Sequence, residues 1–153
     1  MSIFHSLNTS ASALTAQRMR MDVISSNMAN IDTTHGRMVD GEWQPYRRKT
    51  VTFQPREGQF ATMLQAAMGR SVKGSAGYGV TVSRIKEDTE TPFKLVFDPT
   101  HPDANEEGYV SMPNVDPLRE TIDLLSATRS FEANVTVMNA NKAMLMKALE
   151  IGK

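Results

Sequence analysis

The sequence predicts an α+β protein in which long N- and C-terminal α-helices pair as a coiled-coil-like bundle, with a small β-rich module inserted between them. Each end of the chain carries an apolar seam at helical spacing, and the middle consists of short alternating segments bounded by turn residues. The expected boundaries are residues 1–34 for the N-terminal helix, 35–108 for the β-rich module, 109–116 for an extended connection and 117–153 for the C-terminal helix.

The C-terminal helix is predicted first because no Gly or Pro interrupts the chain from Leu118 to Ile151. Asp116 and Pro117 are suited to the N-cap and first helical positions, Glu120 lies in the first turn, and Gly152 is a suitable stop. Its apolar seam advances by steps of three and four residues or their sums, and comprises Leu124, Phe131, Val135, Met138, Leu145 and Leu149. A seam of this kind needs a partner helix.

The N-terminal segment repeats the same spacing. Its seam, interrupted by Ser10 and Gln17, comprises Ile3, Leu7, Leu14, Met21, Ile24, Met28 and Ile31. Its many Ser and Asn residues lower helix propensity, so we expect this helix to order fully only when it packs. We predict both seams as subunit-interface residues. Periodicity alone leaves open whether the helices pair only within one small domain or also pack against further copies.

The middle of the chain predicts extended structure. Residues 25–36 are rich in Asn, Asp, Thr and Gly and end the first helix. Residues 45–53, 79–85 and 93–97 favour strands, and residues 59–68 favour a short helix or a packed loop. The sequence thus indicates a β-rich insertion between helices that are distant along the chain.

Composition excludes several classes of function. The 153 residues carry 17 basic and 17 acidic side chains, so neither nucleic acid nor an anionic membrane is an expected partner. The absence of cysteine excludes disulfides, thiolate metal sites and a cysteine nucleophile. No apolar run reaches the roughly 18 residues of a membrane span, so no membrane insertion is expected. The first residues also lack the pattern of a cleaved secretory signal.

Candidate sites for chemistry are weak. The glycine-rich residues 69–79 lack the ending of a phosphate-binding loop. Asp98, His101 and Asp103 could reach one metal ion, but the two prolines among them indicate a rigid turn instead. We therefore predict no enzyme activity and no catalytic, cofactor or metal site.

A basic cluster, Arg47 to Lys49, lies near Trp43 and Tyr46. Without interleaved aromatic residues or an overall basic charge, nucleic-acid binding is disfavoured. We interpret the cluster as a solvated strand or, because of the two neighbouring aromatic residues, a protein interface.

Four stretches together resemble a known family. Residues 12–34, SALTAQRMRMDVISSNMANIDTT, resemble the amphipathic signature of the axial proteins of the bacterial flagellum. Residues 45–49, 83–115 and 129–152 narrow the resemblance to the proximal-rod proteins of the flagellar basal body. The match covers nearly the whole chain in the family's order.

The resemblance implies a structural subunit of the periplasmic rod. In this family the terminal helices pack in the inner layer of a hollow helical tube that transmits torque, and subunits are exported unfolded by the flagellar type III apparatus without cleavage of a signal. The implied partners are further copies, other rod subunits, the ring-to-rod adaptor, the distal rod and the export apparatus. The resemblance also suggests interface or capping roles for Asn30, Pro113, Asn114, Glu132 and Asn134.

Two other readings remain on the residues alone, and one of them, a metal- or nucleotide-dependent enzyme, would require a site that the sequence does not display. A self-contained coiled-coil adaptor would use the same seams in a small soluble homodimer, and its helices would be ordered in dilute solution. Periodicity does not distinguish a dimer seam from a filament seam.

Overall fold

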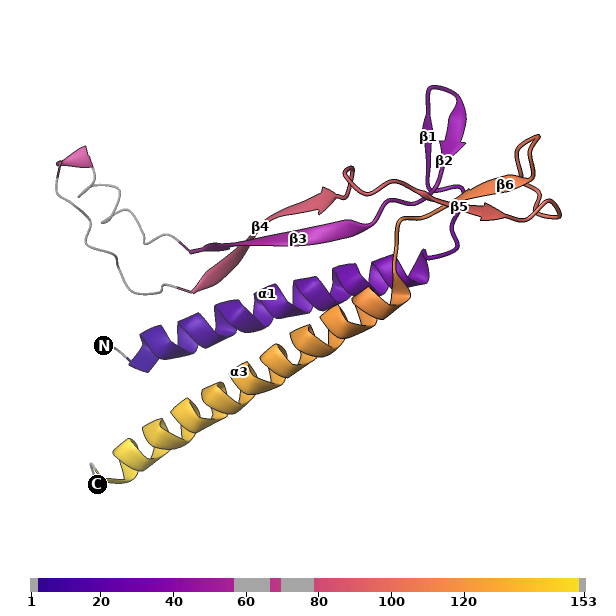
Figure 1. The fold of residues 1–153 in the computed structure, drawn as a ribbon. Helices are drawn as coiled ribbons and strands as arrows, with labels where there is room; N and C mark the ends of the chain where they lie inside the picture. The colour runs from indigo at the N-terminus through magenta and orange to yellow at the C-terminus, as the bar shows by residue number, and fades with distance from the viewer. Residues whose placement is uncertain (1–2, 57–66, 70–78, 152–153) are drawn as a thin grey trace. The chain divides into compact units, whose positions relative to one another are not determined.

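The structure is a computed structural model that describes residues 3–56, 67–69 and 79–151 (Figure 1). It confirms the predicted α+β fold: helices α1 (Ile3–Ala29) and α3 (Pro117–Ile151) pack together, and antiparallel strands lie between them in sequence. Most of the short element predicted over residues 59–68 lies outside the described residues, as does the stop residue Gly152.

Hydroxyl side chains of helix α1 donate hydrogen bonds to backbone carbonyls of the preceding turn. Thr9 Oγ1 donates to the carbonyl of His5 at 2.9 Å, and Ser12 Oγ donates to that of Thr9 at 2.7 Å. The helix ends at Ala29, after which Asn30 N bonds the carbonyl of Asn27 in a tighter turn. Polar side chains are therefore compatible with a helix of this length.

Helix α3 begins as its sequence predicts. Asp116 Oδ1 accepts the backbone N–H of Leu118 at 3.1 Å, which confirms Asp116 as the N-cap. Pro117 occupies the first helical position, where its missing N–H costs nothing.

The strands form three two-stranded sheets among the described residues. Strands β1 (Arg37–Val39) and β2 (Glu42–Gln44) form a hairpin that the sequence interpretation missed. Its turn residues Asp40 and Gly41 have φ values of 53° and 90°, as a tight hairpin turn requires.

The other two sheets contain the strands that were predicted, with shifted limits. Strand β3 (Lys49–Pro55) begins later than the predicted residue 45, and it pairs with β4 (Val80–Glu87). Strand β5 (Lys94–Phe97) pairs with β6 (Tyr109–Met112), which occupies the first half of the predicted extended connection.

The chain divides into two compact units. Unit 1 comprises residues 1–19, 52–84 and 127–153, and unit 2 comprises residues 20–51 and 85–126. In unit 1, the buried Asn141 of α3 donates to Ser6 Oγ of α1 at 2.8 Å. In unit 2, Val23 and Ile24 of α1 are buried, as are Val110 and Val115.

The end of the β3–β4 ribbon in unit 1 is fixed to α1 at a glycine. The backbone N–H of Val80 donates to Ser12 Oγ at 3.0 Å. Gly79 has a φ of 103°, and a Cβ there would overlap the Ser12 hydroxyl. Only glycine allows the strand to approach the helix this closely.

Candidate functional site

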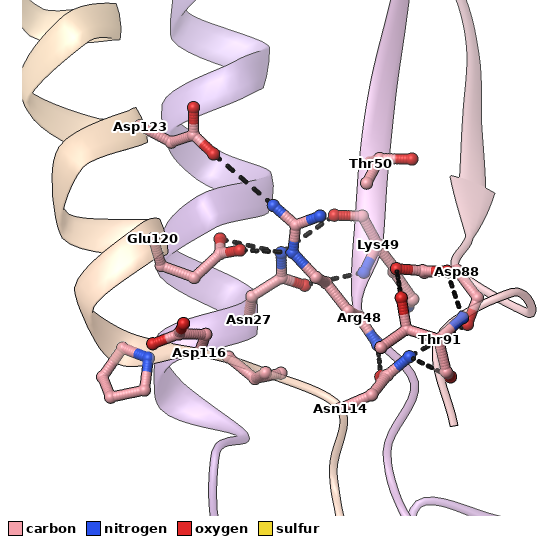
Figure 2. Close-up of polar contacts among 12 residues, drawn as sticks. Asn27, Arg48, Lys49, Thr50, Asp88, Thr91, Asn114, Asp116, Glu120 and Asp123 are labelled. Atoms are coloured by element: carbon pink, nitrogen blue, oxygen red, sulfur yellow. Dashed lines mark hydrogen bonds and ion pairs between the residues drawn. The ribbon is translucent and has the colours of Figure 1, made fainter. Parts of the chain in front are cut away.

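Unit 2 contains a buried polar network that joins both helices to Arg48 and Lys49, at the start of strand β3 (Figure 2). Its centre is Glu120 in the first turn of α3, whose side chain is 0% exposed. Arg48, whose side chain is 11% exposed, donates from Nε to Glu120 Oε1. Asn27 of α1 donates to Glu120 Oε2 at 3.0 Å. Both carboxylate oxygens therefore have a donor.

Asn27 is the second member of this Arg48–Glu120 network. Besides Glu120, its amide donates to the carbonyl of Lys49 at 2.8 Å. Its Oδ1 accepts the N–H of Lys49 at 2.9 Å and the hydroxyl of Tyr46 at 3.0 Å. A single buried side chain thus fixes the start of β3 against α1.

Asn114 serves the segment before α3 in the same way. Its Oδ1 accepts the backbone N–H of Arg48 at 2.8 Å, and its amide donates to the carbonyls of Asp88 and Thr91 at 3.0 and 3.1 Å. Asp88 closes the intervening turn, and its pKa lies below the ordinary value of 3.8, first because it accepts the backbone N–H and hydroxyl of Thr91.

Asp123 extends the network toward solvent. Its two oxygens accept from Arg20 at 2.9 Å and from Arg48 at 3.4 Å, and the side chains of Arg20 and Asp123 are about a third exposed. The network therefore extends from the buried Arg48–Glu120 pair to the partly solvated Arg20–Asp123 pair. Removing either partner of such a pair is costly, because the other charge is then left buried without compensation.

This network corrects the interpretation of the basic cluster as a solvated strand or interface. Arg48 forms a buried ion pair with Glu120 of the same chain, and the Arg47 guanidinium lies 4.4 Å from the ring centroid of Phe93. Sequence reasoning also placed Glu120 only near the positive end of the helix dipole. The sequence did offer a signal, because Glu120 in the first turn of α3 and the cations Arg47 to Lys49 have opposite charges. The two segments are far apart along the chain, so no sequence pattern indicated that they pair.

The predicted seam residues differ in how far their side chains are buried. Ile24 is buried, and Leu149 is exposed at 73%. The side chain of Ile3 lies outside the described residues. The remaining seam residues are all half-buried, namely Leu7, Leu14, Met21, Met28, Ile31, Leu124, Phe131, Val135, Met138 and Leu145.

A second apolar stripe on α3, the outward stripe, was not singled out from the sequence. Its members are exposed by between 49% and 85%, and they are Leu118, Ile122, Leu125, Val137, Met144 and Ile151. The first three repeat the steps of four and three that mark a helix face. This spacing was the signal that could have revealed it.

The positions suggested by the family resemblance make local contacts. Asn30 accepts from Thr33 and donates to the carbonyl of Ser26, and Asn134 donates to the carbonyl of Ser130. Pro113 is buried, whereas Glu132 forms an exposed ion pair with Arg129 at 3.2 Å.

The Asp98–Asp103 segment is a turn, as its prolines predict. Asp98 Oδ1 accepts the hydroxyl of Thr100 at 2.6 Å, and this bond is the first cause of the lowered pKa of Asp98. Among the residues that the structure describes, no three His, Asp or Glu side chains form a group that could hold a metal ion. No described helix combines the length and hydropathy that crossing a membrane requires.

Comparison with known proteins identifies the family. Residues 7–36 match the family model described as flagella basal body rod protein, and residues 106–151 match that described as flagellar basal body rod FlgEFG protein C-terminal. The chain is 64% identical to the flagellar basal-body rod protein FlgC of Bacillus subtilis over the full length of both chains. It is 41% identical to FlgC of Escherichia coli O157:H7, again over the full length of both.

FlgC of Borreliella burgdorferi is 41% identical, with 99% of this chain and 98% of the relative covered. The chain belongs to the FlgC family of flagellar basal-body rod proteins. As a member of this family it is a structural subunit of the rod in the flagellar basal body. In a rod subunit, the outward stripe is a candidate assembly surface.

Proposed function

We propose that this FlgC-family chain forms part of the proximal rod, where the terminal helices of neighbouring subunits pack into a hollow helical drive shaft that transmits torque. The observation that carries the proposal is the outward stripe of α3. Its six large apolar side chains have no cover among the described residues. Burying them would contribute roughly 10 kcal/mol per subunit before the entropy of association is subtracted.

In this proposal the two helix faces have different tasks. The seam residues join α1 to α3 within a subunit, and those that remain half-buried there complete their burial against neighbours. The outward stripe joins α3 to other subunits. The helices thereby form an inner helical domain, and the residues between them form the β-rich module outside it.

The proposed partners are further copies of the chain, other rod subunits, the ring-to-rod adaptor and the distal rod. Passage through the flagellar export apparatus without signal cleavage would deliver the subunit to the periplasm. A chain without cysteine is compatible with this route because it folds without disulfide formation.

The decisive experiment compares two charge insertions on adjacent exposed positions of α3. Ile122 is 60% exposed in the outward stripe, and Thr121 is exposed about 100° around the helix. We expect Ile122→Asp to leave the urea unfolding midpoint of the purified chain unchanged but to prevent its incorporation into basal bodies. Thr121→Asp serves as the control, and it should assemble and support motility in a strain that lacks the wild-type chain.

Seam variants extend the test. Leu14→Asp and Leu145→Asp should also block incorporation, while the strands of unit 2 stay folded by circular dichroism. Normal motility of the Ile122→Asp strain would contradict the proposal.

The alternative is a self-contained coiled-coil adaptor, and the contact between α1 and α3 within one chain favours it. Amide hydrogen exchange on the isolated chain separates the two. Rapid exchange in residues 3–29 and 117–151 around a protected strand region supports the assembly subunit. Firm protection of both helices supports the adaptor.

A further inference from the structure

A groove of about 370 Å³ lies in unit 2, beside the β1–β2 hairpin and strand β6. Two half-exposed aromatic side chains, Trp43 and Tyr109, form walls of the groove, and the buried residues Pro45 and Val110 also line it. Phe97, 63% exposed, lies edge-on to Tyr109 with the ring centroids 5.2 Å apart. The groove thus offers aromatic rings that keep about half of their surface exposed after these intramolecular ring contacts.

The groove also has an acidic rim. Asp103 Oδ2 accepts the hydroxyl of Thr34 at 2.7 Å, and Asp103 Oδ1 lies 3.4 Å from His35 Nε2. The His35 ring in turn packs edge-on against Trp43 at 5.1 Å. Asp103 is therefore held in place at the groove and available to a further donor.

The loop that carries Asp103 adds negative charge. Residues 98–108 contain Asp98, Glu106 and Glu107 as well, and no Lys or Arg. Glu106 and Glu107 are exposed and form no ion pair among the described residues. Aromatic faces beside carboxylates attract a guanidinium or ammonium group through cation–π and ionic contacts. We refer to these features together as the acidic groove.

The chain itself carries a matching surface on β4. Arg84 and Lys86 are two residues apart on a strand, so their side chains leave the same face. Both are exposed, and neither has an ion-pair partner in the part of the chain that the structure describes. The next charge, Glu87, already pairs with Arg37 at 3.6 Å. Two cations without an ion pair among the described residues therefore complement the carboxylates of Glu106 and Glu107 on the loop that borders the groove.

We propose that the acidic groove binds the basic face of β4, Arg84 and Lys86, from a second copy of this chain. The contact joins two different surfaces, so it is heterologous and can repeat from subunit to subunit in a helical assembly. An isologous contact of either surface would place like charges opposite each other. This inference rests on the proposed assembly of copies in the rod and adds a specific contact outside the helix packing.

Cysteine crosslinking tests the contact directly, because the chain contains no cysteine of its own. Two copies with different epitope tags, one carrying Glu107→Cys and the other Lys86→Cys, are produced in one strain and oxidised. We expect a mixed disulfide dimer in whole-cell extract. Strains in which both copies carry Glu107→Cys, or both carry Lys86→Cys, are the matched controls and should give no dimer.

Charge reversal supplies the second readout. Arg84→Glu with Lys86→Glu should lower the yield of assembled chain by about tenfold, and adding Glu106→Lys with Glu107→Lys in the same chain should restore it. Absence of the mixed dimer, dimers only in the controls, or no effect of the reversals would overturn the contact.

The proposed function is scored separately, by immunoblot of the wild-type chain in purified basal bodies. Wild-type chain in that fraction without the mixed dimer would overturn only the groove contact. Its absence from the fraction would overturn the proposed function, whatever the crosslinking result.

Discussion

The Arg48–Glu120 network and the outward stripe of α3 contrast two ways of using one helix. In the network, α3 buries a charged side chain whose two oxygens both have donors. In the outward stripe, the same helix exposes large apolar side chains, such as Leu118 at 70%. The first arrangement is completed within the chain, whereas the second requires another surface. One helix can therefore fix the fold of its own subunit through one face and offer another face to neighbouring subunits.

Units 1 and 2 also differ in how their buried polar side chains are satisfied within the chain. Unit 2 is tied by side-chain hydrogen bonds between segments distant in sequence, centred on Asn27, Arg48 and Asn114. In unit 1, Gln17 Oε1 of α1 is buried and has no hydrogen-bond partner among the described residues. Unsatisfied and exposed groups of this kind are the ones that assembly can complete.

The largest effect is expected from breaking the network at its buried centre. Glu120→Ala removes the acceptor of Arg48 Nε and one of the two acceptors of the Asn27 amide, and it leaves the largely buried guanidinium with only the more distant Asp123, so the free energy of unfolding should fall by about 3–5 kcal/mol. Urea denaturation followed by circular dichroism measures this value. The control is Glu132→Ala, because Glu132 pairs with Arg129 at the surface, and it should cost less than about 0.5 kcal/mol. An equal loss of unfolding free energy in the two variants would show that the buried Arg48–Glu120 pair contributes no more than a surface ion pair.

A smaller effect with a characteristic pH dependence is expected at the edge of the network. The pKa of Asp88 is lowered in the folded chain, so its contribution is present above the unfolded value of 3.8 and is lost as pH falls through the folded value. Asp88→Asn should therefore cost less than about 1 kcal/mol at neutral pH.

The same variant should also flatten the loss of stability between about pH 5 and pH 3. Unfolding curves at several pH values measure this slope. Glu90→Gln, at an exposed position two residues away, should keep the slope of the wild-type chain. An unchanged slope in Asp88→Asn would rule out this role for the carboxylate.

The smallest effect on the isolated chain is expected in the outward stripe. Leu125 is 58% exposed, and the adjacent Leu124 is half-buried. Leu125→Ser should change the free energy of unfolding by less than about 0.5 kcal/mol, whereas Leu124→Ser should cost about 1–2 kcal/mol. Thermal unfolding of the two purified variants gives the comparison. A larger cost for Leu125→Ser would mean that the stripe is already covered within the chain.

Sequence patterns predicted the helices and three of the six described strands, because these elements depend on near neighbours. The uninterrupted run after Pro117 and the cap at Asp116 specify α3 locally, and alternation specified β4 and β5. The β1–β2 hairpin was missed although its Asp40-Gly41 pair is a tight-turn signal, because each strand has only three residues.

What the sequence determined by itself is therefore the two helices, the strands β3, β4 and β5, the spacing of the two apolar seams and, through resemblance, the family. Tertiary structure alone decided that Arg48 belongs to Glu120, a residue 72 positions away, and that the stripe through Ile122 faces outward. The physical reason is that propensity and periodicity act over a few residues, while the partner of a buried charge depends on the path of the whole chain.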